Sequence, residues 1–261
     1  MRRVDDIPYS GRYALTLDLF LPEDRPAEAT IIYLHGGGFR RGRKRDVGSQ
    51  LFAPRLTAEG FAVASVEYRL NTTMDAFSEE DAEVILKLAV RARSSGLTFS
   101  PKLYGPALFA ALEDVSEAIQ FLWVEGEGYG IRSRRVGILG VSAGGIIGAS
   151  LSFPPNVFLN RLVRPDAAVG ISAAVVHPWR LGSPGSPVLL FHGRKDRIIP
   201  EENVAMVARK AAAVNAPLKV IWTGVKGHSS QVPTVHEGRD PEGVAYFDYL
   251  LEHFAPLKVG A

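Results

Sequence analysis

Residues 135–151 read RVGILGVSAGGIIGASL, and the order of residue types in this stretch decides the fold. Residues 135–139 form a short, mostly apolar strand candidate, and the residues after Ser142 are small and apolar, as a buried helix requires. Between them lies Gly140-Val141-Ser142-Ala143-Gly144, a Gly-x-Ser-x-Gly turn. Such a turn exposes the serine hydroxyl on a sharp elbow and directs the next backbone N–H at a reacting carbonyl. The stretch predicts a nucleophile, Ser142, and an oxyanion donor, Ala143.

Short β-branched runs alternate with longer helical patterns along the rest of the chain. The runs are nearly continuous in apolar residues, which is typical of a parallel sheet covered on both faces. This alternation predicts an α/β fold in one domain over residues 1–261, with a mostly parallel central sheet and helices on both faces. The predicted strands are residues 14–21, 30–34, 61–68, 135–139, 167–173, 187–191 and 218–222, and the predicted helices are residues 106–125, 143–151, 201–213 and 242–254.

One stretch, residues 71–105, interrupts this alternation. It contains a further helix candidate at 78–93, whose acidic first turn suits the positive end of the helix dipole. A connector rich in proline and aromatic residues follows. The stretch leaves the C-terminal end of the predicted strand 61–68, where ligands of open α/β sheets bind. We therefore expect a short cap insertion over the substrate pocket, with a solvated excursion as the alternative.

Composition excludes several classes of protein. The 261 residues include 30 Lys and Arg against 28 Asp and Glu, and this net charge of +2 is too balanced for a dedicated nucleic-acid binder. The absence of cysteine excludes disulfide scaffolds and thiolate chemistry. No run reaches the ~18 apolar residues of a membrane span, and the charged start does not read as a signal peptide. We expect a cytoplasmic protein; the sequence leaves its oligomeric state open, a homodimer included.

A second glycine-rich motif, His35-Gly36-Gly37-Gly38-Phe39, closes the predicted strand 30–34. Three successive glycines let the backbone turn close to a ligand and direct several N–H groups at one point. Such a loop can stabilise a developing oxyanion, and we expect Gly37 and Gly38 to donate to it. The alternative is a flexible glycine turn without a function.

Four motifs together resemble a known fold. They are the HGGGF loop, Glu67-Tyr68-Arg69-Leu70, Leu112-Glu113-Asp114-Val115 and the GVSAGG turn that ends at Gly145. In this order they resemble the α/β-hydrolase fold and, within it, the hormone-sensitive-lipase-like carboxylesterases and their short bacterial relatives. The similarity covers about residues 15–254. Two features depart from that family: the first core strand begins near residue 14, without the long N-terminal cap of many members, and the stretch 71–105 is longer than usual.

The resemblance implies a catalytic triad in the order Ser, Asp or Glu, His. Asp196 lies in a short loop after the predicted strand 187–191, in a pattern similar to the family's acid loop. His228 follows the last predicted strand between glycine and serine residues, where the family carries its base. Asp196 could instead cap the following helix, and His236, eight residues beyond His228, is the rival base. The second candidate serine, Ser172, lacks the second glycine of the elbow and is expected in the core.

The resemblance implies a serine carboxylesterase for short- to medium-chain esters, working through an acyl-enzyme on Ser142 without a cofactor. No pair of histidines has metal-ligand spacing with a carboxylate, so we expect no metal. The alternatives are an arylformamidase or small peptidase of the same fold, and a hydrolase-like protein that binds a ligand without turnover. Carbohydrate esterases of the acetyl or feruloyl type are also compatible, although nothing in the sequence indicates secretion. We expect the pocket walls to include Phe39, Tyr68, His177 and Trp179.

A basic run at residues 40–45 (RRGRKR) follows the glycine loop directly and holds five positive charges in six residues. A solvated loop is the favoured interpretation. The alternative is a positive rim that attracts anionic substrates by electrostatic steering.

Overall fold

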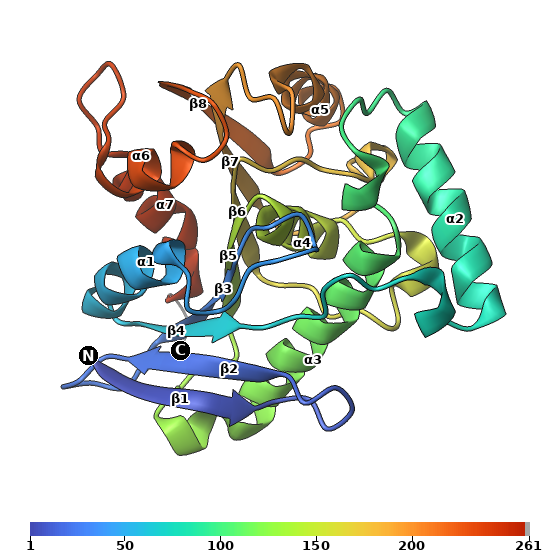
Figure 1. Cartoon of the computed structure of the whole chain (residues 1–261). Coiled ribbons are helices and arrows are strands. Elements are labelled where there is room, and N and C mark those ends of the chain that lie inside the picture. The colour runs from blue at the N-terminus through green and yellow to red at the C-terminus, as the bar shows by residue number, and fades with distance from the viewer. Residues whose placement is uncertain (259–261) are drawn as a thin grey trace.

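Eight strands form one sheet in the order β1-β2-β4-β3-β5-β6-β7-β8 (Figure 1). In this computed structural model, which describes residues 1–258, β3 to β8 run parallel, and β1 and β2 add an antiparallel edge. The predicted mostly parallel α/β sheet is therefore confirmed. The strands are β1 (Arg2–Pro8), β2 (Thr16–Leu21), β3 (Ala29–Leu34), β4 (Phe61–Val66), β5 (Val136–Val141), β6 (Ala167–Ile171), β7 (Val188–Arg194) and β8 (Leu218–Lys226).

Helices cover both faces of the sheet, α1, α6 and α7 on one face and α3, α4 and α5 on the other, with α2 outside α3 (Figure 1). Side chains alternate between the faces along each strand. Ile31 and Tyr33 therefore lie in the core under α1 and α7, and Ile32 and Leu34 in the core under α3 and α4. No helix within residues 1–258 is both long and apolar enough to span a membrane. The helices are α1 (Val47–Ala58), α2 (Glu79–Ser94), α3 (Pro106–Tyr129), α4 (Ala143–Ser152), α5 (Glu201–Ala213), α6 (Gln231–Glu237) and α7 (Tyr246–Phe254).

The predicted helix at 242–254 begins later than its apolar spacing indicates. A turn precedes it, in which the Val244 N–H donates to Asp240 Oδ1 at 2.8 Å and Gly243 takes a φ of 88°. This local side-chain bond competes with helical hydrogen bonding, so α7 starts only at Tyr246.

Strand β1, which precedes the predicted first core strand at the edge of the sheet, was not predicted. Its exposed charged side chains hide the strand pattern, as is common for edge strands. A register shift lies between Val4 and Ile7, and Asp6 takes a φ of 54° there. Helices α1 and α6 were also not predicted. Helix α1 contains Pro54, and its N-cap is Asp46, whose carboxylate accepts the Ser49 N–H at 2.8 Å.

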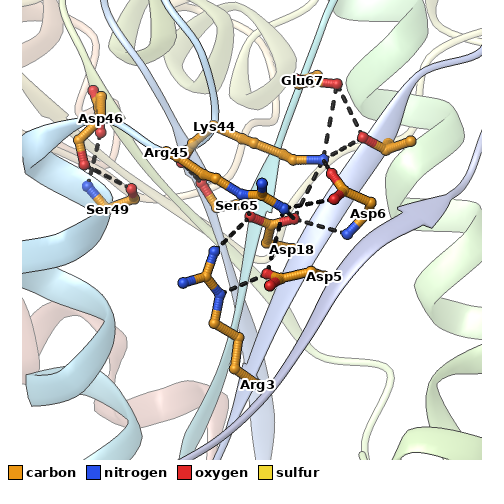
Figure 2. Close-up of polar contacts among 11 residues, drawn as sticks. Arg3, Asp5, Asp6, Asp18, Lys44, Arg45, Asp46, Ser49, Ser65 and Glu67 are labelled. Atoms are coloured by element: carbon orange, nitrogen blue, oxygen red, sulfur yellow. Dashed lines mark hydrogen bonds and ion pairs between the residues drawn. The ribbon is translucent and has the colours of Figure 1, made fainter.

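An ionic cluster ties β1 and β2 to the segment after β3 (Figure 2). At its centre Asp18, fully buried, lies 2.6 Å from Arg45 Nε and 3.2 Å from Lys44 Nζ. Burial would raise the pKa of Asp18, but the bonds and charges of Arg45 and Lys44 hold it well below its ordinary value. The cluster comprises Arg3, Asp5, Asp6, Asp18, Lys44, Arg45 and Glu67.

Candidate active site

The turn between β5 and α4 holds Ser142 in a strained backbone conformation. Its φ is 51° and its ψ is −111°, and its N–H donates to the Ile171 carbonyl at 2.8 Å. The flanking glycines permit this turn, since a Cβ at Gly140 would lie 2.2 Å from the Gly144 carbonyl carbon. A Cβ at Gly144 would lie 2.2 Å from the Leu34 carbonyl oxygen. The close approach of β3, β5 and α4 therefore sets the serine at the carboxyl edge of the sheet.

Three side chains predicted from separate loops form one hydrogen-bonded chain. Ser142 Oγ lies 2.8 Å from His228 Nε2, and His228 Nδ1 lies 2.7 Å from Asp196 Oδ2. They come from the turns that follow β5, β7 and β8, whose carboxyl ends share one edge of the parallel sheet. This arrangement can move a proton from a serine hydroxyl to an imidazole that a carboxylate orients.

The carboxylate of Asp196 is buried but well supplied with donors. Its Oδ1 accepts the backbone N–H groups of Ile198 at 2.8 Å and Ile199 at 3.0 Å, which leaves Oδ2 for His228. Burial would raise the pKa of Asp196, but these hydrogen bonds and the one from His228 outweigh it and lower the pKa from its ordinary value. The group therefore stays charged beside the imidazole.

The glycine loop after β3 turns beside Ser142. Gly37 and Gly38 take φ values of 117° and 65°, which side chains rarely adopt, and a Cβ at Gly37 would lie 1.9 Å from the Arg41 carbonyl oxygen. A Cβ at Gly36 would come within 3.5 Å of Ser142 Cβ, so the loop passes close to the serine. Within residues 1–258, the Gly37 and Gly38 N–H groups donate to no protein acceptor. The N–H of Ala143 opens α4, where helical donors lack a partner.

A cavity of about 730 Å³ opens over these groups. The stretch 71–105 borders it only through its two ends, because α2 packs beside α3 and its Arg91 lies over the Trp179 ring at 4.5 Å. Within residues 1–258, no group of three or more His, Asp or Glu side chains is arranged to hold a metal ion. The lining residues are Gly36, Gly37, Gly38, Arg40, Arg41, Asp46, Asn71, Ser100, Lys102, Leu103, Val141, Ser142, Ile198, His228, Ser229 and Val232.

The four expected wall residues lie elsewhere, and none of them borders this cavity. Tyr68 is buried against His35, with its hydroxyl donating to the His35 carbonyl at 2.7 Å, and Phe39 packs edge-on to Tyr68. His177 is fully enclosed and contacts Trp179, which lines a separate 360 Å³ pocket beside α2. The aromatic side chains that follow the predicted strands therefore pack against other side chains and do not line the candidate active site.

The rival residues are also placed. His236 lies on α6 against Phe52, on the other face of the sheet, and so does not approach Ser142. Ser172 is buried as expected, but its hydroxyl donates to the main-chain carbonyl of His228 at 2.8 Å. Ser172 thus binds the backbone of the loop that carries His228, a role that the sequence analysis did not predict. Its Gly-Ile-Ser-Ala-Ala context, a second elbow-like turn at a strand end, was the available signal.

Comparisons with known proteins give one family model and two named sequence relatives. The BD-FAE family model matches residues 17–84, which include the glycine loop. Gut esterase 1 of Caenorhabditis elegans is 37% identical over 76 residues, 29% of this chain, and its Caenorhabditis briggsae counterpart is 28% identical over 148 residues, 56% of this chain. These matches span only 13% and 22% of the two relatives. The sequence relatives are thus named esterases, in agreement with the resemblance carried by the motifs.

Solved structures resemble the whole chain. A truncated carbohydrate esterase from gut microbiota superposes with a TM-score of 0.69 at 18% identity, covering 99% of this chain and 96% of its own. The propionate-bound esterase Est2 of Thermogutta terrifontis gives a TM-score of 0.65 at 15% identity, covering 95% and 92%. The predicted α/β-hydrolase fold is therefore confirmed.

Proposed function

We propose that this chain is a serine carboxylesterase that hydrolyses short- to medium-chain esters through an acyl-enzyme on Ser142. The observation that carries the proposal is the Ser142–His228–Asp196 hydrogen-bonded chain beneath an open cavity. The esterase names of the sequence relatives support it.

Acylation begins at the serine hydroxyl. His228 Nε2 accepts its proton while Oγ attacks the ester carbonyl, and Asp196 orients the imidazole and stabilises its charged form. The carbonyl oxygen becomes an oxyanion, to which the N–H groups of Gly37, Gly38 and Ala143 donate. Each such donor is worth about 3 kcal/mol of barrier.

Collapse of the tetrahedral intermediate releases the alcohol, which takes the proton from His228. A water molecule then gives a proton to His228 and attacks the acyl-enzyme, so the acid leaves and Ser142 recovers its hydroxyl. No step in this sequence calls for a cofactor. In this proposal residues 71–105 are a partial cap of a single hydrolase domain, since Asn71, Ser100 and Leu103 border the cavity.

Hydrolysis of p-nitrophenyl esters from acetate to laurate, by wild type and Ser142→Ala, tests the proposal. Turnover that disappears in the variant and peaks at short chains is expected. A folded wild-type protein that hydrolyses none of these esters would overturn the esterase proposal. Activity on formanilides or aminoacyl anilides would then favour the amidase alternative. If the protein hydrolyses none of these amides either, a ligand-binding protein is favoured.

A further inference from the structure

The basic run at residues 40–45 divides into two parts in the structure. Lys44 and Arg45 turn into the ionic cluster, where Asp6 and Asp18 balance their charge (Figure 2). Arg40 and Arg41 instead line the cavity beside the glycine loop. The run is therefore not one solvated basic loop, because Lys44 and Arg45 are paired within the ionic cluster whereas Arg40 and Arg41 border the candidate active site.

A third cation reaches the same cavity from the other end of the cap stretch. Lys102 lies in the 3-10 turn at Pro101–Leu103 and lines the cavity together with Arg40 and Arg41. The side chains of these three cations are exposed, and none of them has an ion-pair partner among residues 1–258. They are free to pair with a ligand.

The cavity contains little negative charge to offset them. Among residues 1–258, Asp46 is the one acidic residue on its lining, and its carboxylate accepts the Ser49 N–H at 2.8 Å and the Tyr33 hydroxyl at 3.0 Å. Three cations against one acid contrast with the whole chain, where 30 Lys and Arg face 28 Asp and Glu. The excess of positive charge is thus local to the cavity.

Hydrogen bonds to Gly37, Asn71 and Ser65 fix the backbone of the segment that carries Arg40 and Arg41. The N–H groups of both residues donate to the Gly37 carbonyl at 3.2 and 3.3 Å, and Asn71 Nδ2 donates to the Arg40 carbonyl at 3.0 Å. Further along, the Ser65 hydroxyl donates to the Lys44 carbonyl at 2.6 Å. Because the segment is fixed at both ends, the backbone that carries the two arginine side chains holds a defined position beside the glycine loop.

We propose that this cavity selects esters that carry a carboxylate besides the ester group, such as monoesters of dicarboxylic acids and esters of hydroxy acids. The proposal rests on the esterase function proposed above and adds the substrate class. Arg40, Arg41 and Lys102 bind the carboxylate while Ser142 attacks the ester. Guanidinium groups suit this task because they donate two parallel hydrogen bonds to one carboxylate.

The test compares matched pairs of esters that differ in one charge. On the alcohol side the pair is 4-acetoxybenzoate and its methyl ester; on the acyl side it is mono-p-nitrophenyl adipate and p-nitrophenyl hexanoate. The readout is the ratio of kcat/KM for the anionic ester to that for the neutral one, each corrected for spontaneous hydrolysis. In wild type the ratio exceeds one for at least one pair, and it falls as salt rises, because added ions screen the attraction.

The variants distinguish the effect of the cations that line the cavity from the effect of the net charge of the protein. Arg40→Gln/Arg41→Gln should lower the ratio about tenfold and Lys102→Gln about threefold, as expected for partly exposed ion pairs. Arg41→Lys keeps the charge and should retain most of the ratio. Arg43→Gln is the matched control, since Arg43 lies in the same run but does not border the cavity, and it should leave the ratio unchanged.

The outcomes distinguish this proposal from the one on which it rests. Ester turnover that requires Ser142, with a ratio that is the same in wild type and Arg40→Gln/Arg41→Gln, overturns the anion selection and leaves the esterase intact. If no ester is turned over, the esterase fails. Titration calorimetry of Ser142→Ala with 4-acetoxybenzoate then still decides whether the cations bind a carboxylate: binding that Arg40→Gln/Arg41→Gln weakens supports the site, and no binding overturns it.

Discussion

Two turns of this sheet hold their serines at nearly the same φ but against different atoms of one histidine. Gly140-Val141-Ser142-Ala143-Gly144 ends β5, and Gly170-Ile171-Ser172-Ala173-Ala174 ends the neighbouring β6. The φ of the serine is 51° in the first turn and 52° in the second. Each serine N–H also donates to a carbonyl of the next strand, Ser142 to Ile171 at 2.8 Å and Ser172 to Phe191 at 2.9 Å.

The side chains separate the two turns. Ser142 Oγ faces the His228 imidazole, whereas Ser172 Oγ donates to the His228 main-chain carbonyl. After Ser142 the chain enters α4 directly, because Gly144 lets it pass against β3, while Ala174 carries a side chain and no regular helix follows. A turn with a strained serine is therefore not enough to place the hydroxyl against an imidazole, as the proposed nucleophile requires.

The largest expected effect is the loss of the first serine. Ser142→Ala removes the proposed nucleophile and should lower kcat by about 10⁶-fold, as in triads that act as one unit. The p-nitrophenyl acetate rate, compared with a melting curve that shows an intact fold, checks this. A variant that keeps more than a tenth of wild-type activity would remove the distinction between the two turns.

The acid comes next. Asp196→Asn keeps the shape but removes the charge that orients His228, and kcat should fall by about 10⁴-fold. The pKa of Asp196 lies below the ordinary aspartate value near 3.8, so the wild-type carboxylate is ionised at every pH above that value. The loss of kcat in Asp196→Asn should therefore persist over that whole range. A kcat profile from pH 5 to pH 9 measures it, and a variant that recovers wild-type kcat anywhere in this range would contradict the role.

The difference in glycine content predicts a stability effect. Gly144→Ala places a Cβ 2.2 Å from the Leu34 carbonyl oxygen and should lower the free energy of unfolding by about 3 kcal/mol, as overpacked cores do. This sign is opposite to the usual gain from alanine in a helix. Ala174→Gly is the control at the matching position of the second turn, and urea unfolding of both should show the larger loss in Gly144→Ala.

The second serine should matter least. Ser172→Ala removes one hydrogen bond to the His228 carbonyl, worth about 1 kcal/mol, and kcat should fall by up to about tenfold with KM unchanged. Ser172→Thr keeps the hydroxyl and should recover part of kcat if it is accommodated. A loss as large as that of Ser142→Ala would mean that the two serines do not have separate roles.

Several features of the fold could be predicted because they are local. The apolar runs placed seven of the eight strands, and the apolar spacing gave α5 its observed bounds of Glu201–Ala213. Candidate site residues could be chosen for a related reason: parallel strands end at one edge, so residues that follow β5, β7 and β8 are expected to converge. The structure brings Ser142, Asp196 and His228 into contact there.

Other features depend on partners distant in the chain. The charged strand β1 forms because it pairs with β2, while buried Asp18 binds cations that lie 26 and 27 positions later, Lys44 and Arg45. The expected wall residues failed for the same reason, since His177 and Trp179 are enclosed by α2, α3 and their neighbours and not by the cavity.

The sequence by itself determined the α/β class, the position of the strained serine turn and the order of the candidate triad, because strand pattern and glycine geometry are properties of short segments. Only the tertiary structure decided that the Ser172 hydroxyl donates to the main-chain carbonyl of His228. It also decided which cations of the basic run are neutralised by Asp6 and Asp18 and which remain in the cavity. Both outcomes depend on side chains that approach across the sheet from distant parts of the chain, and no local pattern records that approach.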